Sequence, residues 1–151
     1  MEAQLQRVHD VMSSPILVGI DGSPQGDKAF SYALNLAHQA DTALHACAVV
    51  YGADIEMAEA SEREALVERR RSRLHQHIDQ LSVQAADTGT TVHTHVLEGQ
   101  PVEQLLSLAS QLKIGHIVVG HRSKGLFEQL LMGSVAKRVV DFARCNVTVV
   151  R

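Results

Sequence analysis

Five short apolar runs alternate with four segments of helical spacing along this chain. The runs are of strand length, and they fall at residues 15–20, 42–51, 90–97, 114–120 and 146–151. The helical segments between them fall at residues 24–39, 55–86, 101–112 and 134–143. Stretches such as 46–50 and 114–119 are apolar without alternation, which is typical of strands covered on both faces of a parallel sheet. Residues 90–97 alternate instead, which predicts a strand nearer an edge.

Strands and helices in strict alternation predict an α/β fold with helices on both faces of an open, five-stranded parallel sheet. We take the strand order to be 3-2-1-4-5, as in Rossmann-like and adenine nucleotide alpha hydrolase-like folds. Ligands of such folds bind at the carboxyl ends of the strands, where the strand order reverses. That point lies between the first and fourth strands, whose carboxyl ends carry Asp21 and Gly120.

Local signals refine several elements. Ser23 followed by Pro24 predicts a helix start with a hydroxyl N-cap and proline at the first position. In the last helix we expect Val135, Val139, Phe142 and Ala143 to share one buried face. The first half of the long helical segment, residues 56–73, is heavily charged and is expected to be partly a loop, and residues 1–14 are expected to be a tail or frayed turn.

The polar stretch from Gly120 to Gly133 joins the fourth strand to the helix that begins near Ser134. We expect its glycines to adopt positive φ and to approach a ligand closely, and the helix N-terminus offers N–H groups suited to a phosphate. The stretch is neither a Walker A loop nor a GxGxxG motif, since Leu126-Phe127 stands where Lys-Ser/Thr is needed. A tight turn without any ligand is the alternative interpretation.

Composition excludes several classes of function. A length of 151 residues predicts one domain, and the net charge of −3 gives no support for general binding to nucleic acid or to an anionic membrane. No apolar run reaches the roughly 20 residues that span a bilayer, and the start of the chain does not resemble a secretion signal. Cys47 and Cys145 lack CxxC spacing and are interpreted as free thiols, so we expect a cytoplasmic protein.

The combination of four stretches resembles the universal stress protein (UspA-like) family from residue 15 to the end of the chain, as a single domain after the tail 1–14. The stretches are Ile16-Leu17-Val18-Gly19-Ile20-Asp21-Gly22-Ser23, Gly99-Gln100-Pro101, Ile117-Val118-Val119-Gly120 with Gly133-Ser134-Val135-Ala136, and Ala143-Arg144-Cys145-Asn146-Val147-Thr148-Val149-Val150. The ATP-binding branch of that family has a loop of the form G-x2-G-x9-G-S/T. Here Gly120, Gly133 and Ser134 match that form, while Ser123 replaces the second glycine.

The resemblance implies a set of residues that bind ATP, with Mg²⁺ as a companion ion. Asp21 would face the nucleoside and help to hold the metal, Val49 would line the adenine pocket, and the N–H and hydroxyl groups of the loop and last helix would hold the phosphates. The complete set is Gly19, Ile20, Asp21, Val49, Val119, Gly120, Arg122, Ser123, Gly133, Ser134 and Val135. The alternatives are that Asp21 only caps a turn, that Val49 is ordinary core, and that Ser134 is only an N-cap.

We therefore expect a stress or energy-state regulator that binds ATP or AMP, whose nucleotide changes the 120–134 loop and a surface seen by a protein partner. The resemblance also implies a homodimer through the last strand, residues 147–150, because an apolar edge strand needs protection. The alternative is a dimeric interaction module of the same fold without nucleotide, which Ser123 favours. A weak ATPase using Asp21 and Mg²⁺ is the third hypothesis, and since no nucleophile–base pair is present we expect at most slow hydrolysis.

Two polar clusters stand apart from that site. His93 and His95 share one strand face and could chelate a metal, but no third ligand is placed by the sequence, so we interpret the nine histidines as solvated. The basic run at residues 69–73 follows several glutamates and is interpreted first as a solvated helix face and second as a docking patch for a partner.

Overall fold

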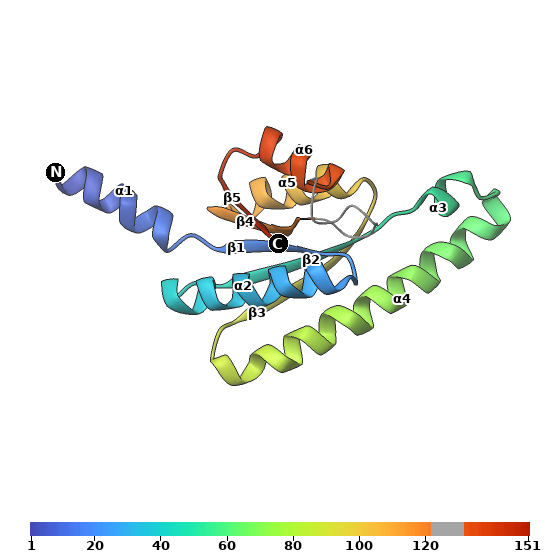
Figure 1. Ribbon diagram of the computed structural model, residues 1–151, viewed down its shortest axis with the longest axis horizontal. Coiled ribbons are helices and arrows are strands. Elements are labelled where there is room, and N and C mark those ends of the chain that lie inside the picture. The colour runs from blue at the N-terminus through green and yellow to red at the C-terminus, as the bar shows by residue number, and fades with distance from the viewer. Residues whose placement is uncertain (122–131) are drawn as a thin grey trace.

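The computed structural model describes residues 1–121 and 132–151, and its centre is a single parallel sheet (Figure 1). The strands lie in the order β3-β2-β1-β4-β5, which confirms the predicted fold class. Their bounds are β1 Ile16–Ile20, β2 Leu44–Val50, β3 Val92–Glu98, β4 His116–Gly120 and β5 Asn146–Val150. The alternating strand, β3, lies at one edge of the sheet, as predicted.

Helices cover both faces of the sheet (Figure 1). Their bounds are α1 Glu2–Met12, α2 Pro24–Ala40, α3 Ala53–Met57, α4 Ala60–Ala85, α5 Pro101–Gln111 and α6 Ser134–Phe142, with a 3-10 turn at Ala86–Thr88. Helices α2 and α4 pack on one face, and α5 and α6 pack on the other. Within the described chain, no helix is both long and apolar enough to cross a membrane.

Strand side chains alternate between two hydrophobic cores, one on each face. Val18 and Ala46 point into the core under α2 and α4, whereas Leu17 and Cys47 point into the core under α5 and α6. Both cores contain residues with no exposed surface, so burial on each face stabilises the fold. The gain is about 25 cal/mol for each Å² of apolar surface removed from water. Two-sided burial explains why these strands lack polar alternation.

Two local expectations about the helices differ from the structure. Residues 2–12 form helix α1, which extends away from the sheet (Figure 1), because they combine good helix formers with no Gly or Pro. Residues 60–85 form one continuous helix rather than a partial loop. The buried positions of α4 that hold it to the sheet are Val67, Leu74, Ile78, Leu81 and Ala85.

Arginine side chains explain why the charged half of α4 is ordered. The Arg63 guanidinium donates to the carbonyls of Ile55 and Glu56 at 3.2 and 3.0 Å. Arg70 donates to the Tyr51 carbonyl at 2.7 Å and pairs with Asp54 at 2.9 Å. Part of the basic run at residues 69–73, namely Arg70, is therefore engaged in contacts within the molecule, and these hold α4 to the segment that follows β2.

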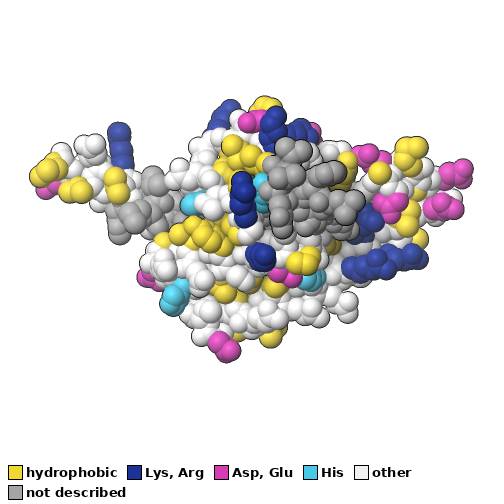
Figure 2. All heavy atoms as spheres, viewed as in Figure 1, with side chains coloured by type: hydrophobic (Ala, Val, Ile, Leu, Met, Phe, Trp, Pro, Cys, Tyr) yellow, Lys and Arg dark blue, Asp and Glu magenta, His cyan; other side chains and the backbone are white. Residues whose placement is uncertain are grey.

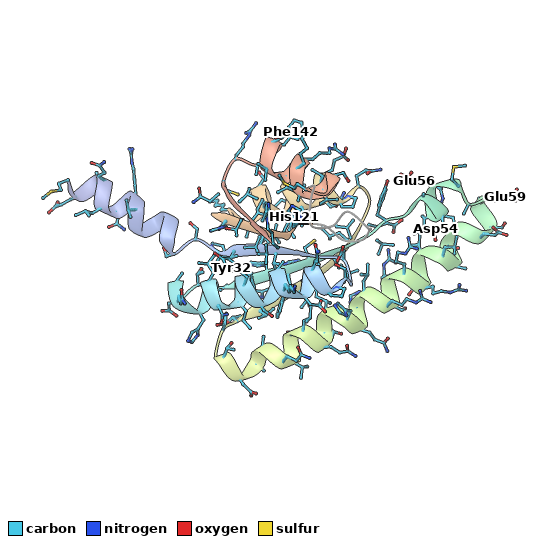
Figure 3. All side chains as sticks on the ribbon, in the orientation of Figure 1. Tyr32, Asp54, Glu56, Glu59, His121 and Phe142 are labelled. Carbon is cyan, nitrogen blue, oxygen red and sulfur yellow. The ribbon has the colours of Figure 1, made fainter. Side chains whose placement is uncertain are left out.

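Helix α6 buries only part of the face that was expected. Val139 is 0% exposed and Ala143 packs against the core, as expected, whereas Val135 and Phe142 are 37% and 63% exposed. Figure 3 shows the Phe142 side chain at the outer end of this helix. Apolar spacing therefore identified the helix and its buried Val139 correctly, but the second buried position is Ala136, at 2% exposure.

Candidate functional site

The two central strands separate at the carboxyl edge of the sheet. Strands β1 and β4 pair from Ile16 with His116 to Val18 with Val118, and their ladder ends there. Each central strand stays paired further with its outer neighbour: β1 pairs with β2 as far as Ile20, and β4 pairs with β5 as far as Gly120. The parting occurs where the strand order reverses, which is the position where doubly wound folds bind ligands. We call this candidate position, between the ends of β1 and β4, the crevice.

A tight turn after β1 forms one wall of the crevice. Gly22 has a φ of +83°, a conformation that glycine adopts at little cost. The Asp21 Oδ1 atom accepts hydrogen bonds from the Ser23 N–H at 2.9 Å and from the Ser23 hydroxyl at 2.5 Å. The buried Ser23 Oγ in turn accepts from the Gly26 N–H at 3.1 Å, which confirms the predicted N-cap of α2. Asp21 therefore braces this turn while its side chain stays exposed.

The opposite wall is the end of β4, where the chain returns to α6. The His121 N–H donates to the Val150 carbonyl at 2.6 Å, and the His121 carbonyl accepts from the Gly133 N–H at 2.8 Å. The His121 side chain is 6% exposed and lies near the centre of the molecule (Figure 3). These backbone bonds place the first residue before α6 directly beside the end of β4.

The N-terminus of α6 has no side-chain cap. Gly133 occupies the N-cap position with a φ of −62°, and the first turn contains no acidic residue. Ser134 and Val135 are exposed there. Because the first N–H groups of a helix lack intrahelical partners, this end can bind an anion such as a phosphate.

Gly120 differs from the expected positive-φ glycine. Positive φ occurs at Gly22, Gly89 and Gly99 among the described glycines, and not at Gly120 or Gly133. A Cβ atom on Gly120 would lie 3.1 Å from the Gln25 carbonyl oxygen. The glycine is therefore needed because β4 ends against the first turn of α2, a close approach that the sequence did not indicate.

The remaining predicted residues fall into three groups. Ile20 and Val119 are buried, at 4% exposure each. Val49 is half-buried at the end of β2 and packs against the core under α5 and α6, and a Cβ on Gly19 would lie 3.4 Å from Leu105 in that same core. Gly19, Val49 and Val119 therefore share the face under α5 and α6, whereas Ile20 belongs to the core under α2 and α4 on the other face. Arg122 and Ser123 lie outside the described residues.

Gly26 is a further site residue that sequence analysis missed. A Cβ atom here would lie 2.8 Å from the Asp21 Oδ1 atom. The absence of a side chain therefore leaves room for the Asp21 carboxylate to bend back over the start of α2. A glycine three residues after a Ser-Pro helix start was the available signal.

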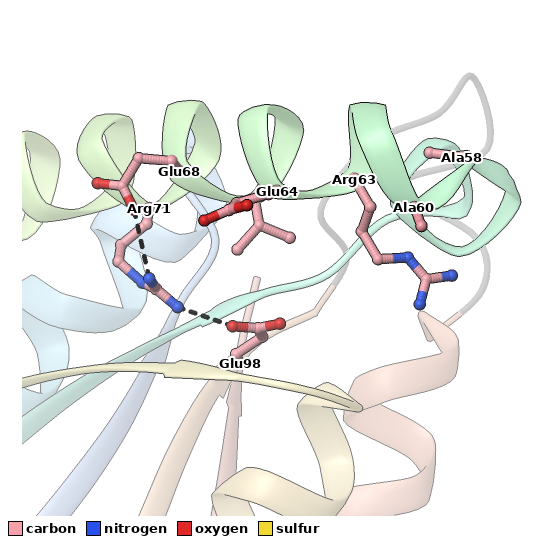
Figure 4. A pocket seen from close by; sticks show the side chains of 8 residues that line it. Ala58, Ala60, Arg63, Glu64, Glu68, Arg71 and Glu98 are labelled. Atoms are coloured by element: carbon pink, nitrogen blue, oxygen red, sulfur yellow. Dashed lines mark hydrogen bonds and ion pairs between the residues drawn. The ribbon is translucent and has the colours of Figure 1, made fainter.

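Two clefts lined by described residues lie away from Asp21, Gly120 and Ser134. The larger, about 530 Å³, lies between the first half of α4 and the end of β3 (Figure 4). In it the Arg71 guanidinium bridges Glu68 at 3.4 Å and Glu98 at 2.7 Å. Acidic side chains gather around α3 and the start of α4, with basic ones along the adjoining part of α4 (Figure 2). Since much of this charge is paired internally, the cleft is the weaker candidate for an anionic ligand.

Asp21 could contribute one carboxylate to a metal ion that a nucleotide brings with it. Among residues 1–121 and 132–151, no group of three His, Cys, Asp or Glu side chains is arranged to hold a metal ion. Mg²⁺ commonly binds through one or two carboxylates together with substrate phosphates and waters, so a lone Asp fits that mode.

A doubly wound sheet with a crevice at its reversal point defines the general class of this protein. Its relatives define the family: the universal stress protein family model matches residues 12–151, so the chain belongs to the universal stress protein family. A universal stress protein of Methanocaldococcus jannaschii is 30% identical over 137 residues, which cover 90% of this chain and 81% of the relative. One of Mycolicibacterium smegmatis is 34% identical over 97% of this chain, which spans 48% of that longer relative.

Solved structures agree with this assignment. The universal stress protein UspA of Lactobacillus plantarum superposes with a TM-score of 0.83 at 26% identity, covering 92% of this chain and 98% of the other. Structures of the same fold with lower identity include a universal stress protein in complex with cAMP, one from Archaeoglobus fulgidus with dAMP, and one from Arabidopsis thaliana with AMP. Their TM-scores are 0.69, 0.64 and 0.65 at 20, 17 and 13% identity, and they share the fold with this chain.

Proposed function

We propose that this chain binds an adenine nucleotide, ATP with Mg²⁺, between the carboxyl ends of β1 and β4. The parting of these strands after Val18 and Val118 carries the proposal. It sets the exposed Asp21 on one side and the uncapped N-terminus of α6 on the other. The complexes of structural neighbours with cAMP, dAMP and AMP support an adenine nucleotide as the ligand class.

Each part of the crevice suits one part of the nucleotide. The N–H groups at Ser134 and Val135, beside Gly133, would hold phosphate oxygens, because they lie in a first helical turn without acidic side chains. The Gly133 N–H itself already donates to the His121 carbonyl. Asp21 would accept from a ribose hydroxyl or bind the Mg²⁺ ion. Gly19, Val49 and Val119, with Gly120 at the end of β4, would lie beneath the nucleoside, and Ile20 would support them from the core on the other face. We assign Arg122 and Ser123 to the phosphates from the loop pattern.

We assign no catalytic residue and expect at most slow ATP hydrolysis. Hydrolysis needs a group that positions the attacking water. Asp21, the carboxylate that we assign to the site, already accepts two hydrogen bonds from Ser23. We therefore propose a cytoplasmic regulator whose nucleotide occupancy alters the 120–134 loop and thereby a surface recognised by a protein partner.

We also propose a homodimer through β5, residues 147–150. This strand lies at the edge of the sheet and pairs on one side with β4. Its sequence is Val-Thr-Val-Val, with the neighbouring α6 side chains of Val140 and Phe142 45% and 63% exposed. An apolar edge strand is normally protected from unwanted pairing. Sedimentation equilibrium at micromolar concentration should give twice the mass of the chain, and a mass of one chain would contradict the dimer.

Isothermal titration with ATP, ADP and AMP tests the nucleotide site directly. Asp21→Asn should weaken binding of ATP in Mg²⁺. A larger loss in Mg²⁺ than in EDTA would assign the carboxylate to the metal, and an equal loss in both would assign it to the ribose. Asp87→Asn is the matched control, since Asp87 is exposed in the turn after α4. Equal affinity of the Asp21 variant, the control and the unaltered chain would contradict the assigned site.

The absence of binding by all three nucleotides would instead favour the interaction module without nucleotide. In that outcome the replacement of the second loop glycine by Ser123 would mark a lost site, and the dimer measurement would remain informative. Binding accompanied by rapid release of ADP would contradict the assignment of a non-enzymatic regulator.

A further inference from the structure

Three histidines gather at the β3 edge of the sheet, far from the nucleotide crevice. His45 is the second residue of β2, and it lies directly opposite His93 of β3. His95 follows two positions along β3, on the same side of the strand. The three share the face that carries Cys47 and Leu97, which is the face covered by α5 and α6.

The three imidazole rings are in contact. The ring centroids of His45 and His93 lie 4.8 Å apart, and those of His45 and His95 lie 5.2 Å apart. The His45 Nδ1 atom lies 2.9 Å from the His95 Nε2 atom. The sequence placed two of these residues on one strand face, and the parallel register of β2 with β3 supplies the third.

Imidazole nitrogens bind metals through the neutral form, which donates a lone pair. Burial, with His93 and His95 close by, lowers the pKa of His45 to about 4. Burial and the nearby His93 also lower the pKa of His95. These shifts reflect the close packing of the three rings, which also places the His45 and His95 nitrogens within reach of one another.

The distance between the two facing nitrogens is close to that of a metal-bound pair. Two nitrogens bound to one tetrahedral ion at 2.0–2.1 Å lie about 3.3 Å apart. The His45 and His95 nitrogens would need to separate by about 0.4 Å from their 2.9 Å contact to reach that value. An ion could thus replace the proton that the two nitrogens now share.

The third ring must turn before it can join them. The rings stand nearly parallel, at 22° for His45 with His93, and in this arrangement the described side chains do not surround a common metal position. His93 is exposed at the edge of the sheet, so its ring can rotate without disturbing the core. Cys47 lies beside His95 in the register, but its buried thiol has a pKa raised to about 12 and belongs to the apolar core.

We propose that His45, His93 and His95 form a binding site for one divalent ion of the zinc, nickel and copper group. Two histidines at alternate positions of one strand and a third on the neighbouring strand converge on one side of a sheet. Such ions favour imidazole ligands, whereas Mg²⁺ and Ca²⁺ favour oxygen. Three ligands leave a fourth position for water or another small molecule.

Zinc titration of the chain, freed of any histidine tag and stripped with EDTA, tests this proposal. We expect about one Zn²⁺ per chain, because the rings are in contact and can bind one ion once His93 has turned. Co²⁺ should give the visible absorption of a four-coordinate ion. His93→Ala should weaken Zn²⁺ binding by on the order of 100-fold, since it removes a ligand. His93 is exposed, so this variant should fold normally, as far-UV circular dichroism can check.

His75→Ala is the matched control, because His75 is exposed on α4 and apart from the cluster. It should bind Zn²⁺ as the unaltered chain does. Proton NMR of the imidazole rings adds a second readout, in which substoichiometric Zn²⁺ should shift the signals of the three clustered histidines together. The proposal is overturned if the chain takes up no Zn²⁺ at about 100 µM, a level far weaker than protein zinc sites. Equal affinity in the His93 and His75 variants would overturn it as well.

Discussion

Removing the Ser23 hydroxyl should destabilise the turn that shapes the nucleotide crevice. In Ser23→Ala, α2 loses its N-cap, because Ser23 Oγ no longer accepts from the Gly26 N–H. Loss of a Ser cap costs about 1 kcal/mol. The hydroxyl's 2.5 Å bond to the Asp21 carboxylate is also lost, and bonds to charged groups contribute about 1.5–3 kcal/mol. Because Asp21 is exposed, we take about 1 kcal/mol for this bond, the contribution of an ordinary hydrogen bond, and expect a total loss of about 2 kcal/mol.

Urea unfolding followed by far-UV circular dichroism measures this loss, since the chain has no Trp. A loss of about 2 kcal/mol should also lower Tm by about 4–8 °C in a chain of this length. Ser72→Ala, at an exposed position within α4, is the control and should change stability by no more than about 0.5 kcal/mol.

A double-mutant cycle with Asp21→Asn isolates the hydroxyl–carboxylate bond. The two changes together should cost about 1 kcal/mol less than the sum of the single changes, because they remove one shared interaction. A loss below about 0.5 kcal/mol in Ser23→Ala, or strict additivity in the cycle, would refute the reasoning.

Three further predictions concern the core, the close approach at β4 and the histidine cluster. Leu17→Ala, at a position with no exposed surface, should cost about 2–5 kcal/mol in urea unfolding. Gly120→Val should cost about 1–3 kcal/mol and weaken nucleotide binding, because its Cβ would press on the Gln25 carbonyl. For His45, the folded pKa of about 4 lies below the unfolded value of 6.5, so the unfolded chain binds the proton more readily and stability falls as pH drops between these values. The ring is only partly buried, so we expect His45 to account for about 1 kcal/mol of the stability lost between pH 7.5 and 4.5, measured in EDTA. His45→Gln should not show this part of the loss. Equal pH dependence in both chains would contradict the assignment.

The strands could be predicted because burial on both faces requires unbroken apolar runs in the sequence. Their order was taken from doubly wound folds, and the structure confirms it. Runs such as Ala46 to Val50 can satisfy burial on both faces only in a covered parallel sheet. The sequence of helix α1 has no comparable pattern of buried positions. Its side chains Leu5 and Val8 are 63% and 52% exposed, so intrinsic propensity rather than packing explains the helix.

Features that depend on contacts between distant segments could not be predicted. Periodicity identified α6 but not which of two neighbouring stripes faces the sheet, because Val135 and Ala136 are both apolar. Gly120 required knowledge of the Gln25 carbonyl, and the third histidine required the register of β2 against β3. The positions of Asp21 and Gly120 could be predicted, because both follow from the carboxyl ends of β1 and β4.

The nucleotide carried by the freshly purified chain tests the central claim most directly. After denaturation, the supernatant is run on an ion-exchange column calibrated with ATP, ADP and AMP. Gly133→Glu is the informative variant, because a φ of −62° accepts a side chain and the added carboxylate would occupy the proposed phosphate position. Gly133→Ala is its control.

We predict about one adenine nucleotide per chain in the unaltered protein and in Gly133→Ala, and a clear loss in a folded Gly133→Glu, because a carboxylate at this helix N-terminus would repel a phosphate. An absence of nucleotide in the unaltered protein, with no change in Tm on adding millimolar ATP and Mg²⁺, would contradict the account.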